Sequence, residues 1–302
     1  MTNKLLSLTF LAPLVISTTV FANSNSVLGV EIGDDKVQVQ QALQAKCNSL
    51  TIKSAHQVSF PLAKQSELHV VCEAVKSGGK AAVILADDKV VHVYATGLAN
   101  SEITQVEGEN KQYLDYQISS DHTLWRNAKT DSVTLLSHKG LHPNLFVWEN
   151  FYLNVDREEI KPVTLNEGLP TFLRYGASIE ELKSELESQC HPMQVQESNP
   201  WLPNKPKQQT QVNCFNVNYL GFPRKMELVF GDDKLELVWI LSAEEEEKRI
   251  RDQLVGHFGL ASSINDKWET FNGGKVYLRK DKPEVLAVSD ALVKHYRSAN
   301  NK

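Results

Sequence analysis

Apolar residues recur at helical spacing in two short segments, one near the start of each half of the chain. The stripe in the first half is Val39, Leu43 and Cys47, and the stripe in the second half is Ile179, Leu182, Leu186 and Cys190. Each stripe follows a capping signal, which pairs Asp35 with Gln38 in the first half and Ser178 with Glu181 in the second. The pattern therefore predicts two short helices whose apolar face ends at a cysteine.

Apolar runs typical of β-strands follow each predicted helix. They span residues 68–74, 81–85 and 90–94 in the first half and 210–217, 225–230 and 235–241 in the second. Residues 87–89 and 232–234 each place Asp-Asp-Lys between the last two runs. Paired aspartates could bind a metal or perform acid–base chemistry, but a position between two alternating runs predicts a tight hairpin turn.

Further elements are predicted after each hairpin. A capping box of Ser242 and Glu245, with a stop at Gly259, predicts a helix over residues 242–258. A looser pattern predicts a counterpart over residues 101–116, although it contains Gly108. Each half then closes with a tryptophan, a strand and a proline-led apolar run, and a short helix is predicted near 289–296. The closing segments are Trp125 with 133–136 and 143–147, and Trp268 with 276–278 and 283–288.

Five landmarks of different chemical type occur in both halves at a nearly constant separation. The separations are 143, 143, 142, 145 and 143 residues, for the pairs Gly33 and Gly176, Cys47 and Cys190, Cys72 and Cys214, Asp87 and Asp232, and Trp125 and Trp268. A period held this closely indicates a tandem duplication in which each copy is large enough to fold as a domain. The predicted fold class is α+β, with two tandem homologous domains that each pack helices on an antiparallel sheet with one disulfide.

The predicted domain boundaries follow from the repeat and from one charged stretch. The first α+β repeat is expected over residues 23–155, a linker over 156–165 and the second repeat over 166–302. The charged stretch 156–162 is where the two copies are expected to meet, and each copy is expected to fold as a separable domain.

Residues 1–22 have the pattern of an export signal. Lys4 precedes an apolar run, and Val20 and Ala22 supply small residues at the positions before a cleavage site. An uncleaved membrane anchor is the alternative, but Pro13 and several hydroxyl residues interrupt a run shorter than the roughly 20 apolar residues that a span needs. No later segment is apolar enough to cross a bilayer, so the mature chain is expected in the periplasm or outside the cell.

Export changes the interpretation of the four cysteines, because disulfides persist outside the reducing cytosol. Four cysteines allow three pairings, and the repeat selects Cys47 with Cys72 and Cys190 with Cys214, one disulfide in each copy. A four-thiolate zinc site would instead need ligand pairs two to four residues apart, and the sequence has none.

The charge of the chain disfavours two classes of partner. The full sequence has 32 Lys and Arg against 37 Asp and Glu; removing Lys4 with residues 1–22 leaves 31 against 37, a net charge of −6. An acidic chain is a poor ligand for nucleic acid and for anionic membrane surfaces. The expected partner is a protein or another component of the cell envelope.

The sequence contains no catalytic motif that we can identify. A nucleophile elbow, a zinc-protease helix, a phosphate-binding loop and a dinucleotide fingerprint are all missing. His138 and His142 have a spacing that would suit a metal on a helix, but they precede Pro143, so a loop is predicted. No catalytic residue, metal ligand or cofactor is predicted.

The longest loop inside the second disulfide is the best candidate for an interaction surface. It places three prolines around Trp201 and Leu202, and the matching loop of the first copy contains Phe60 before a proline. An aromatic side chain braced in this way loses little entropy when it binds a partner. The alternative is that Trp201 folds back and covers the core of its own domain.

Gly176-Ala177-Ser178 before the predicted helix, and the hairpin over residues 230–239, resemble small exported bacterial domains. These are the beta-lactamase-inhibitor-like fold and the related outer-membrane lipoproteins of the SmpA/OmlA type. The resemblance implies helices packed against an antiparallel sheet and a role in binding rather than catalysis. The repeat is longer here, and the lipidation cysteine of the lipoproteins is missing.

Together these features predict an exported, non-enzymatic binding protein of the bacterial envelope that acts through two duplicated domains. An envelope hydrolase that uses carboxylates not identifiable from the sequence is one alternative. A structural accessory protein is the other.

Overall fold

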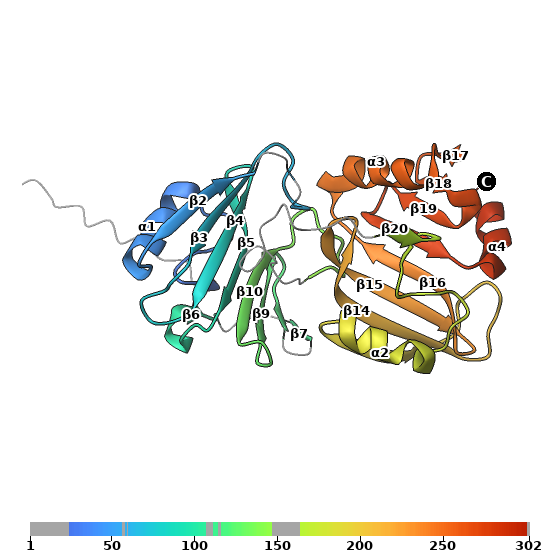
Figure 1. Ribbon diagram of the computed structural model, residues 1–302, viewed down its shortest axis with the longest axis horizontal. Coiled ribbons are helices and arrows are strands. Elements are labelled where there is room, and N and C mark those ends of the chain that lie inside the picture. Colours follow the sequence, from blue (N-terminus) through green and yellow to red (C-terminus); the bar gives the residue numbers. More distant parts are fainter. Residues whose placement is uncertain are drawn as a thin grey trace, which may run out of the picture.

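The computed structural model of the chain contains two α+β domains that lie side by side (Figure 1). The structure describes residues 24–55, 58, 60–106, 111–113, 116–146 and 164–300, with the backbone alone at 111–113 and 297–300. The predicted export signal and residues 156–163 of the predicted linker lie outside these residues.

The first domain consists mainly of short antiparallel strands and one helix. Its elements are β1 (Ser26–Val27), α1 (Lys36–Lys46), β2 (Leu50–Ser54), β3 (Glu67–Cys72), β4 (Lys80–Ala86), β5 (Lys89–Thr96), η1 (Asn100–Glu102), β6 (Ile103–Thr104), β7 (Lys111–Tyr113), β8 (Tyr116–Ile118), β9 (His122–Asn127) and β10 (Ser132–Ser137).

The second domain has a similar order of strands and two further helices. Its elements are β11 (Leu165–Asn166), β12 (Leu169–Pro170), α2 (Ile179–Gln189), β13 (Met193–Ser198), β14 (Gln209–Tyr219), β15 (Phe222–Gly231), β16 (Lys234–Leu241), η4 (Glu244–Glu246), α3 (Glu247–Phe258), β17 (Ser263–Ile264), β18 (Trp268–Phe271), η5 (Asn272–Gly274), β19 (Val276–Arg279), β20 (Glu284–Val288) and α4 (Asp290–Asn300).

Each domain has one antiparallel sheet of eight strands, and the two sheets share one topology. The strand order is β2-β3-β4-β5-β10-β9-β8-β7 in the first and β13-β14-β15-β16-β20-β19-β18-β17 in the second. One row of paired residues therefore crosses each sheet in the same way. The row is Ile52, Val70, Val83, Val93, Leu135, Leu124 and Gln117 in the first sheet, and Val195, Val212, Leu228, Val238, Ala287, Val276 and Phe271 in the second.

The local signals in the sequence form the structures that they predict. Asp35 caps α1 and Ser178 caps α2, and both caps are reciprocal capping boxes. The Asp-Asp-Lys triplets are tight turns, with Asp87 at φ 49° and Asp232 at φ 46°. Left-handed backbone at both aspartates of each triplet matches the right-handed twist of the flanking strands.

The two disulfides join the helices to the sheets. Cys47 is bonded to Cys72 and Cys190 to Cys214, the pairing that the repeat predicts. In each domain the bond connects the residue after the first helix with the strand next to the edge of the sheet. The helix is thereby held over the apolar face on which its own stripe packs.

The fifth landmark of the repeat is wrong. Trp125 lies on β9, opposite Thr134, whereas Trp268 lies on β18, which is one strand nearer the edge of its sheet. The residue of the second domain that matches Trp125 in the register is Tyr277, opposite Leu286. The two tryptophans share a spacing but not a place in the fold.

The helix predicted over residues 101–116 is also wrong. The described residues of this range form η1, β6 and β7, and Tyr116 begins β8. In the second domain α3 packs over a sheet face that includes Phe271 and Leu278. The register places Gln117 and Arg126 at the matching positions of the first sheet, and this polar surface offers an apolar helix face little to bury.

Helix α3 begins later than the sequence predicts, at Glu247 rather than after Ser242. Ser242 is buried and forms no cap, and η4 precedes the helix. The side chain of Glu246 accepts the backbone N–H of Ala243 and forms a buried ion pair with Arg224. A tertiary ion pair therefore sets the entry to this helix. Residues 143–146, which belong to the proline-led apolar run of the first copy, lie in a loop.

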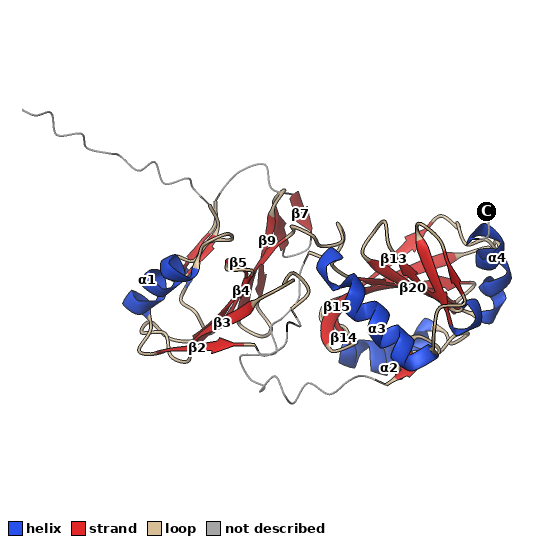
Figure 2. Cartoon of the chain, turned by 90° about the horizontal axis from the view of Figure 1, so that it is seen from above, coloured by secondary structure: helices blue, strands red, loops and turns tan. Residues whose placement is uncertain are grey.

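The two faces of the second sheet are covered by different helices. Leu182 of α2 and Ile250 of α3 pack on one face in the main core. On the other face, Leu292 of α4 packs against Val229 and Val288. In both views α4 lies at the end of the second domain that is away from the first domain (Figures 1 and 2).

The corresponding outer face of the first sheet packs against the second domain, and we call this contact the seam. An apolar cluster fills the seam; its members are Phe60, Leu62, Ala63, Ile84, Ala86, Leu136, Leu141 and Leu145 from the first domain and Phe222, Leu241 and Ala243 from the second. A short antiparallel bridge joins Leu141 to Ala243. The two domains therefore share buried apolar surface besides having cores of their own.

Candidate functional site

Trp201 is held in an exposed position by a rigid loop. The side-chain oxygen of Gln209 accepts the backbone N–H groups of Trp201 and Leu202 at 3.0 and 3.1 Å. The side chain of Leu202 is 2% exposed and packs under the loop with Val229 and Leu237, whereas that of Trp201 is 47% exposed. Fixing both backbone amides leaves the indole presented to solvent with little freedom of the chain beneath it.

The other two candidate interaction residues are not exposed. Leu202 anchors its loop on the sheet, and Phe60 is fully buried in the seam. The ring of Phe60 meets that of Phe222 edge to face at 5.3 Å, and its carbonyl accepts a hydrogen bond of 3.0 Å from Arg249. Phe60 therefore contacts the second domain of its own chain. Both side chains fold back because each loop crosses an apolar face of a sheet.

The edge strands β2 and β13 occupy the same position in the two domains. Among the described residues, β2 pairs only with β3 and β13 only with β14, so one side of each strand is open. Ile52 and Val195 are the matching ends of the row that crosses each sheet, and they are 38% and 50% exposed. We call these two strands the open edges. Exposed Lys53 and Glu197 flank the aliphatic residues.

Two hollows also lie at matching positions of the repeat. One, of about 470 Å3, lies beside the β9–β10 turn, and its lining includes Leu98 and Arg126. The other, of about 240 Å3, lies beside the β19–β20 turn, and its lining includes Ala243 and Leu278. In each domain a backbone hydrogen bond of 2.9 Å ties the turn to the end of the neighbouring strand; Gly97, after β5, donates to Asp131, and Ser242, after β16, donates to Pro283. The walls of the two hollows differ in chemistry, because the first hollow has Arg126 at the register position that Leu278 occupies in the second.

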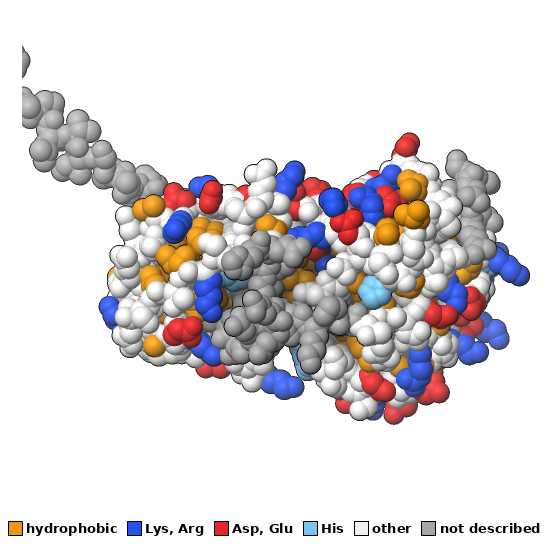
Figure 3. Space-filling view, turned by 45° about the horizontal axis from the view of Figure 1, so that its top comes forward, with side chains coloured by type: hydrophobic (Ala, Val, Ile, Leu, Met, Phe, Trp, Pro, Cys, Tyr) orange, Lys and Arg blue, Asp and Glu red, His pale blue; other side chains and the backbone are white. Residues whose placement is uncertain are grey.

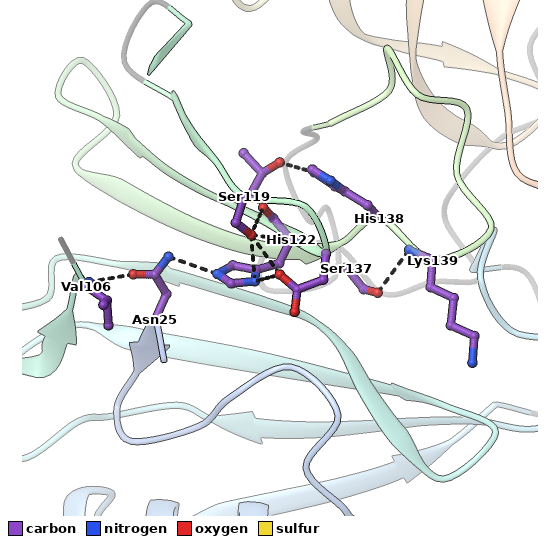
Figure 4. A network of polar contacts seen from close by, with 9 residues as sticks. Asn25, Val106, Ser119, His122, Ser137, His138 and Lys139 are labelled. Carbon is purple, nitrogen blue, oxygen red and sulfur yellow. Dashed lines mark hydrogen bonds and ion pairs between the residues drawn. The ribbon is translucent and has the colours of Figure 1, made fainter. Parts of the chain in front are cut away.

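A polar network surrounds His122 at the start of β9 (Figure 4). Nδ1 of His122 lies 2.6 Å from Oδ1 of Asp121 and 3.0 Å from Oγ of Ser119. Nε2 of the same ring lies 2.9 Å from the side-chain nitrogen of Asn25. A catalytic triad needs its hydroxyl and its carboxylate on opposite ring nitrogens. Here both are on Nδ1, so the network does not activate Ser119.

The two histidines considered for a metal do not converge. His138 contacts the hydroxyl of Thr123 in the first domain, and burial lowers the pKa of His138 to about 4. His142 is directed to the second domain instead. No group of three or more His, Cys, Asp or Glu side chains in the described part of the chain is placed to hold a metal ion.

A buried polar contact crosses the seam. Nε2 of His142 lies 3.0 Å from Oε2 of Glu284, and both side chains are almost fully buried. The backbone N–H of Asn144 donates to Nδ1 of His142, so the neutral ring carries its proton on the nitrogen that faces the carboxylate. Burial alone would raise the pKa of Glu284, but the contacts with His142 and Arg279 outweigh burial and hold the pKa below its usual value.

The surface charge gives no single dominant field on the visible face of the molecule. Lys and Arg side chains are interspersed with Asp and Glu side chains on the face seen in Figure 3. Among the described residues, no helix combines the length and the apolar character needed to cross a bilayer. Recognition at this face would rest on local contacts rather than on net charge.

No protein family, curated protein or solved structure matches the chain. The resemblance to beta-lactamase-inhibitor-like and SmpA/OmlA-type domains therefore stays a prediction. The open edges are the feature that sequence reasoning missed. The available signal was an aliphatic residue at a nearly constant distance before the second cysteine of each copy. Ile52 lies 20 positions before Cys72, and Val195 lies 19 positions before Cys214.

Proposed function

We propose that the protein is an exported, non-enzymatic binding protein of the bacterial envelope. Each of its two domains would offer an open edge to an extended segment of a partner protein, which would add to the sheet as a further strand. The disulfides support export, because such bonds persist in oxidising compartments. The resemblance stated for the sequence, which implies binding, agrees with this proposal.

One observation carries the proposal, namely that the same open edge occurs in both domains with an exposed aliphatic residue at the same register. Ile52 and Val195 end equivalent rows of the two sheets. Folded proteins usually protect a sheet edge with charged side chains, proline, a bulge or a covering element. The two edges here carry Lys53 and Glu197, but no other described strand pairs with them. An open edge provides backbone hydrogen bonds to any extended chain, and alternate side chains provide selectivity.

Trp201 extends the second open edge. Ser198, the last residue of β13, pairs with Gln209, whose side chain holds the backbone of Trp201. An exposed indole beyond the end of an edge strand would give a partner segment an aromatic anchor, the residue type that most often dominates binding energy. The network around His122 gives no support to the hydrolase alternative, since its hydroxyl and carboxylate share one ring nitrogen.

Site-specific photocrosslinking tests the proposal. A photoreactive phenylalanine derivative placed at Thr51 or Gln196, on the open edges, should give adducts with the same partner in an envelope extract. The derivative placed at Lys183, on the exposed side of α2, is the control. Adducts from all three positions would indicate nonspecific contact, and adducts from Lys183 alone would refute binding at the edges.

Charge substitution provides the second arm of the test. Ile52→Lys together with Val195→Lys should weaken partner capture at least about tenfold, which corresponds to roughly 1.4 kcal/mol. Val37→Lys is the matched control, because Val37 is an aliphatic residue that is 60% exposed on α1 rather than on an edge. Equal capture by the edge variant and by the control would contradict the proposed function.

A further inference from the structure

The orientation of the Asn25 side chain is fixed by the backbone. The N–H of Val106 donates to Oδ1 of Asn25 at 2.8 Å. A backbone amide can only donate, so the oxygen of the Asn25 amide must face Val106 and its nitrogen must face His122. The distance from that nitrogen to Nε2 of His122 is 2.9 Å (Figure 4).

The fixed amide determines the tautomer of His122. Because the Asn25 nitrogen is a donor, Nε2 of His122 must be the acceptor, and the ring proton must lie on Nδ1. Nδ1 then donates toward the carboxylate of Asp121, 2.6 Å away. The neutral Nδ1–H form satisfies Asn25, Val106 and Asp121 together.

The contact joins the N-terminal strand to the main sheet. Asn25 precedes β1, which pairs with β6, and Val106 follows β6. His122 is the first residue of β9. Val27 and Leu28, next to Asn25, are fully buried in the core of the first domain. Release of Asn25 would therefore loosen the strand that covers one side of this core.

We propose that Asn25, Val106 and His122 form a pH-sensitive latch that holds the β1–β6 element on the sheet when His122 is neutral and releases it when His122 is protonated. Protonation places an N–H on Nε2 directly opposite the NH2 group of Asn25. Turning the Asn25 amide over removes that clash but sets its NH2 group against the N–H of Val106. Each arrangement sets two N–H donors against each other in a largely buried site, and this opposition is destabilising.

Two ionisable groups among the described residues face the His122 ring. The Asp121 carboxylate lies on the Nδ1 side of the ring, away from Asn25, and its side chain is 75% exposed, so water and salt screen its charge. His138, at the end of β10, is close enough for its charge to interact with that of His122. Burial lowers the pKa of His138 to about 4, so His138 carries no charge at either pH of the experiment described below.

Hydrogen exchange on the full mature protein at pH 7.5 and 5.5, corrected for the intrinsic effect of pH, tests the latch. Protection of the β1 and β6 amides should fall roughly tenfold at pH 5.5, as expected for the loss of one hydrogen bond and the opposition of two donors. The amides of β14 in the second domain are the control, because their protection falls only if the whole protein becomes less stable. An equal change in β1, β6 and β14, or no change in any of them, would overturn the proposal.

Two variants separate the latch from other titrating groups. His122→Gln should remove the pH dependence of β1 and β6, because the side chain no longer changes charge. Asn25→Asp should reverse the dependence, because a carboxylate can accept from both Val106 and a protonated His122. Preserved wild-type behaviour in either variant would contradict the latch. If Asn25→Asp does not fold, the ring nitrogen chemical shifts of His122 in the wild-type protein at pH 7.5 provide the test. An Nε2–H tautomer would exclude the latch.

Discussion

Truncation of Phe60 is the most direct test of the seam. The side chain is fully buried, contacts Phe222 edge to face at 5.3 Å and stacks on His92 at 5.6 Å. Phe60→Ala removes these contacts and leaves a cavity between two rigid sheets, which typically costs about 3–5 kcal/mol for a buried aromatic residue. That loss corresponds to a fall of roughly 10 °C in melting temperature for a protein of this size.

The seam also predicts a change in the shape of the transition. In the wild type, shared apolar burial should couple the two domains and give one calorimetric peak. In Phe60→Ala the coupling should weaken, so the peak should split or broaden, and binding of a hydrophobic dye should increase. Leu260→Ala is the control, because Leu260 is 85% exposed and lies in the second domain away from the seam cluster. A loss below about 1 kcal/mol in Phe60→Ala, or an equal loss in the control, would refute this account of the seam.

Three further predictions follow from the contacts described above. Trp201→Ala should lower the melting temperature by no more than about 2 °C, because the indole is 47% exposed, and iodide should quench its fluorescence readily. Glu246→Ala should lower the free energy of unfolding in chemical denaturation by roughly 3–5 kcal/mol, because it leaves Arg224 buried without its carboxylate. Glu245→Ala, at the exposed neighbouring position, should lower it little. Equal losses in the two variants would show that the buried pair is not the cause. Because the pKa of Glu284 is lower in the folded protein, its carboxylate stabilises the fold at pH values above its pKa in the unfolded chain, and this stabilisation is lost as the pH falls through the lowered pKa. In Glu284→Gln the free energy of unfolding should therefore fall less steeply with decreasing pH. An unchanged pH dependence would contradict this role of Glu284.

Signals that depend on a few neighbouring residues could be read from the sequence. Ser178 caps its helix through a residue three positions away, and the turn at Asp232 needs only its own backbone and the two flanking strands. The disulfides could be paired because each copy of the repeat holds two cysteines. In these cases the physical cause lies within a short stretch of chain, or within one period of the repeat.

Features that depend on tertiary contacts could not be read in this way. The start of α3 is set by the ion pair between Glu246 and Arg224, which are 22 residues apart. The buried position of Phe60 depends on Phe222, which belongs to the other domain. Spacing alone matched Trp125 with Trp268. The first domain forms β7 and β8 before it reaches Trp125, whereas the second forms α3 and β17 before it reaches Trp268, so the two residues lie on different strands. In each case the partner lies far along the chain, so spacing within one element could not reveal the contact.

The separable domains expected from the repeat have a specific weakness in this structure. A chain that begins at Leu165 would keep the core of the second domain but would uncover Phe222 and Leu241 at the seam. Such a fragment should still unfold cooperatively and should bind a hydrophobic dye more strongly than the whole protein does. Weak dye binding would indicate that the second domain covers its side of the seam by itself.

Helix α4 covers the face of the second sheet that corresponds to the seam face of the first sheet. The outer face of the first sheet, around Ile84 and Leu136, is covered by the next domain, and the matching face of the second sheet, around Val229 and Val288, is covered by α4. The two sheets thus carry equivalent apolar faces, one covered by a domain and the other by α4. Without α4 the face around Val229 and Val288 would become an exposed apolar patch, the kind of surface that drives association between molecules.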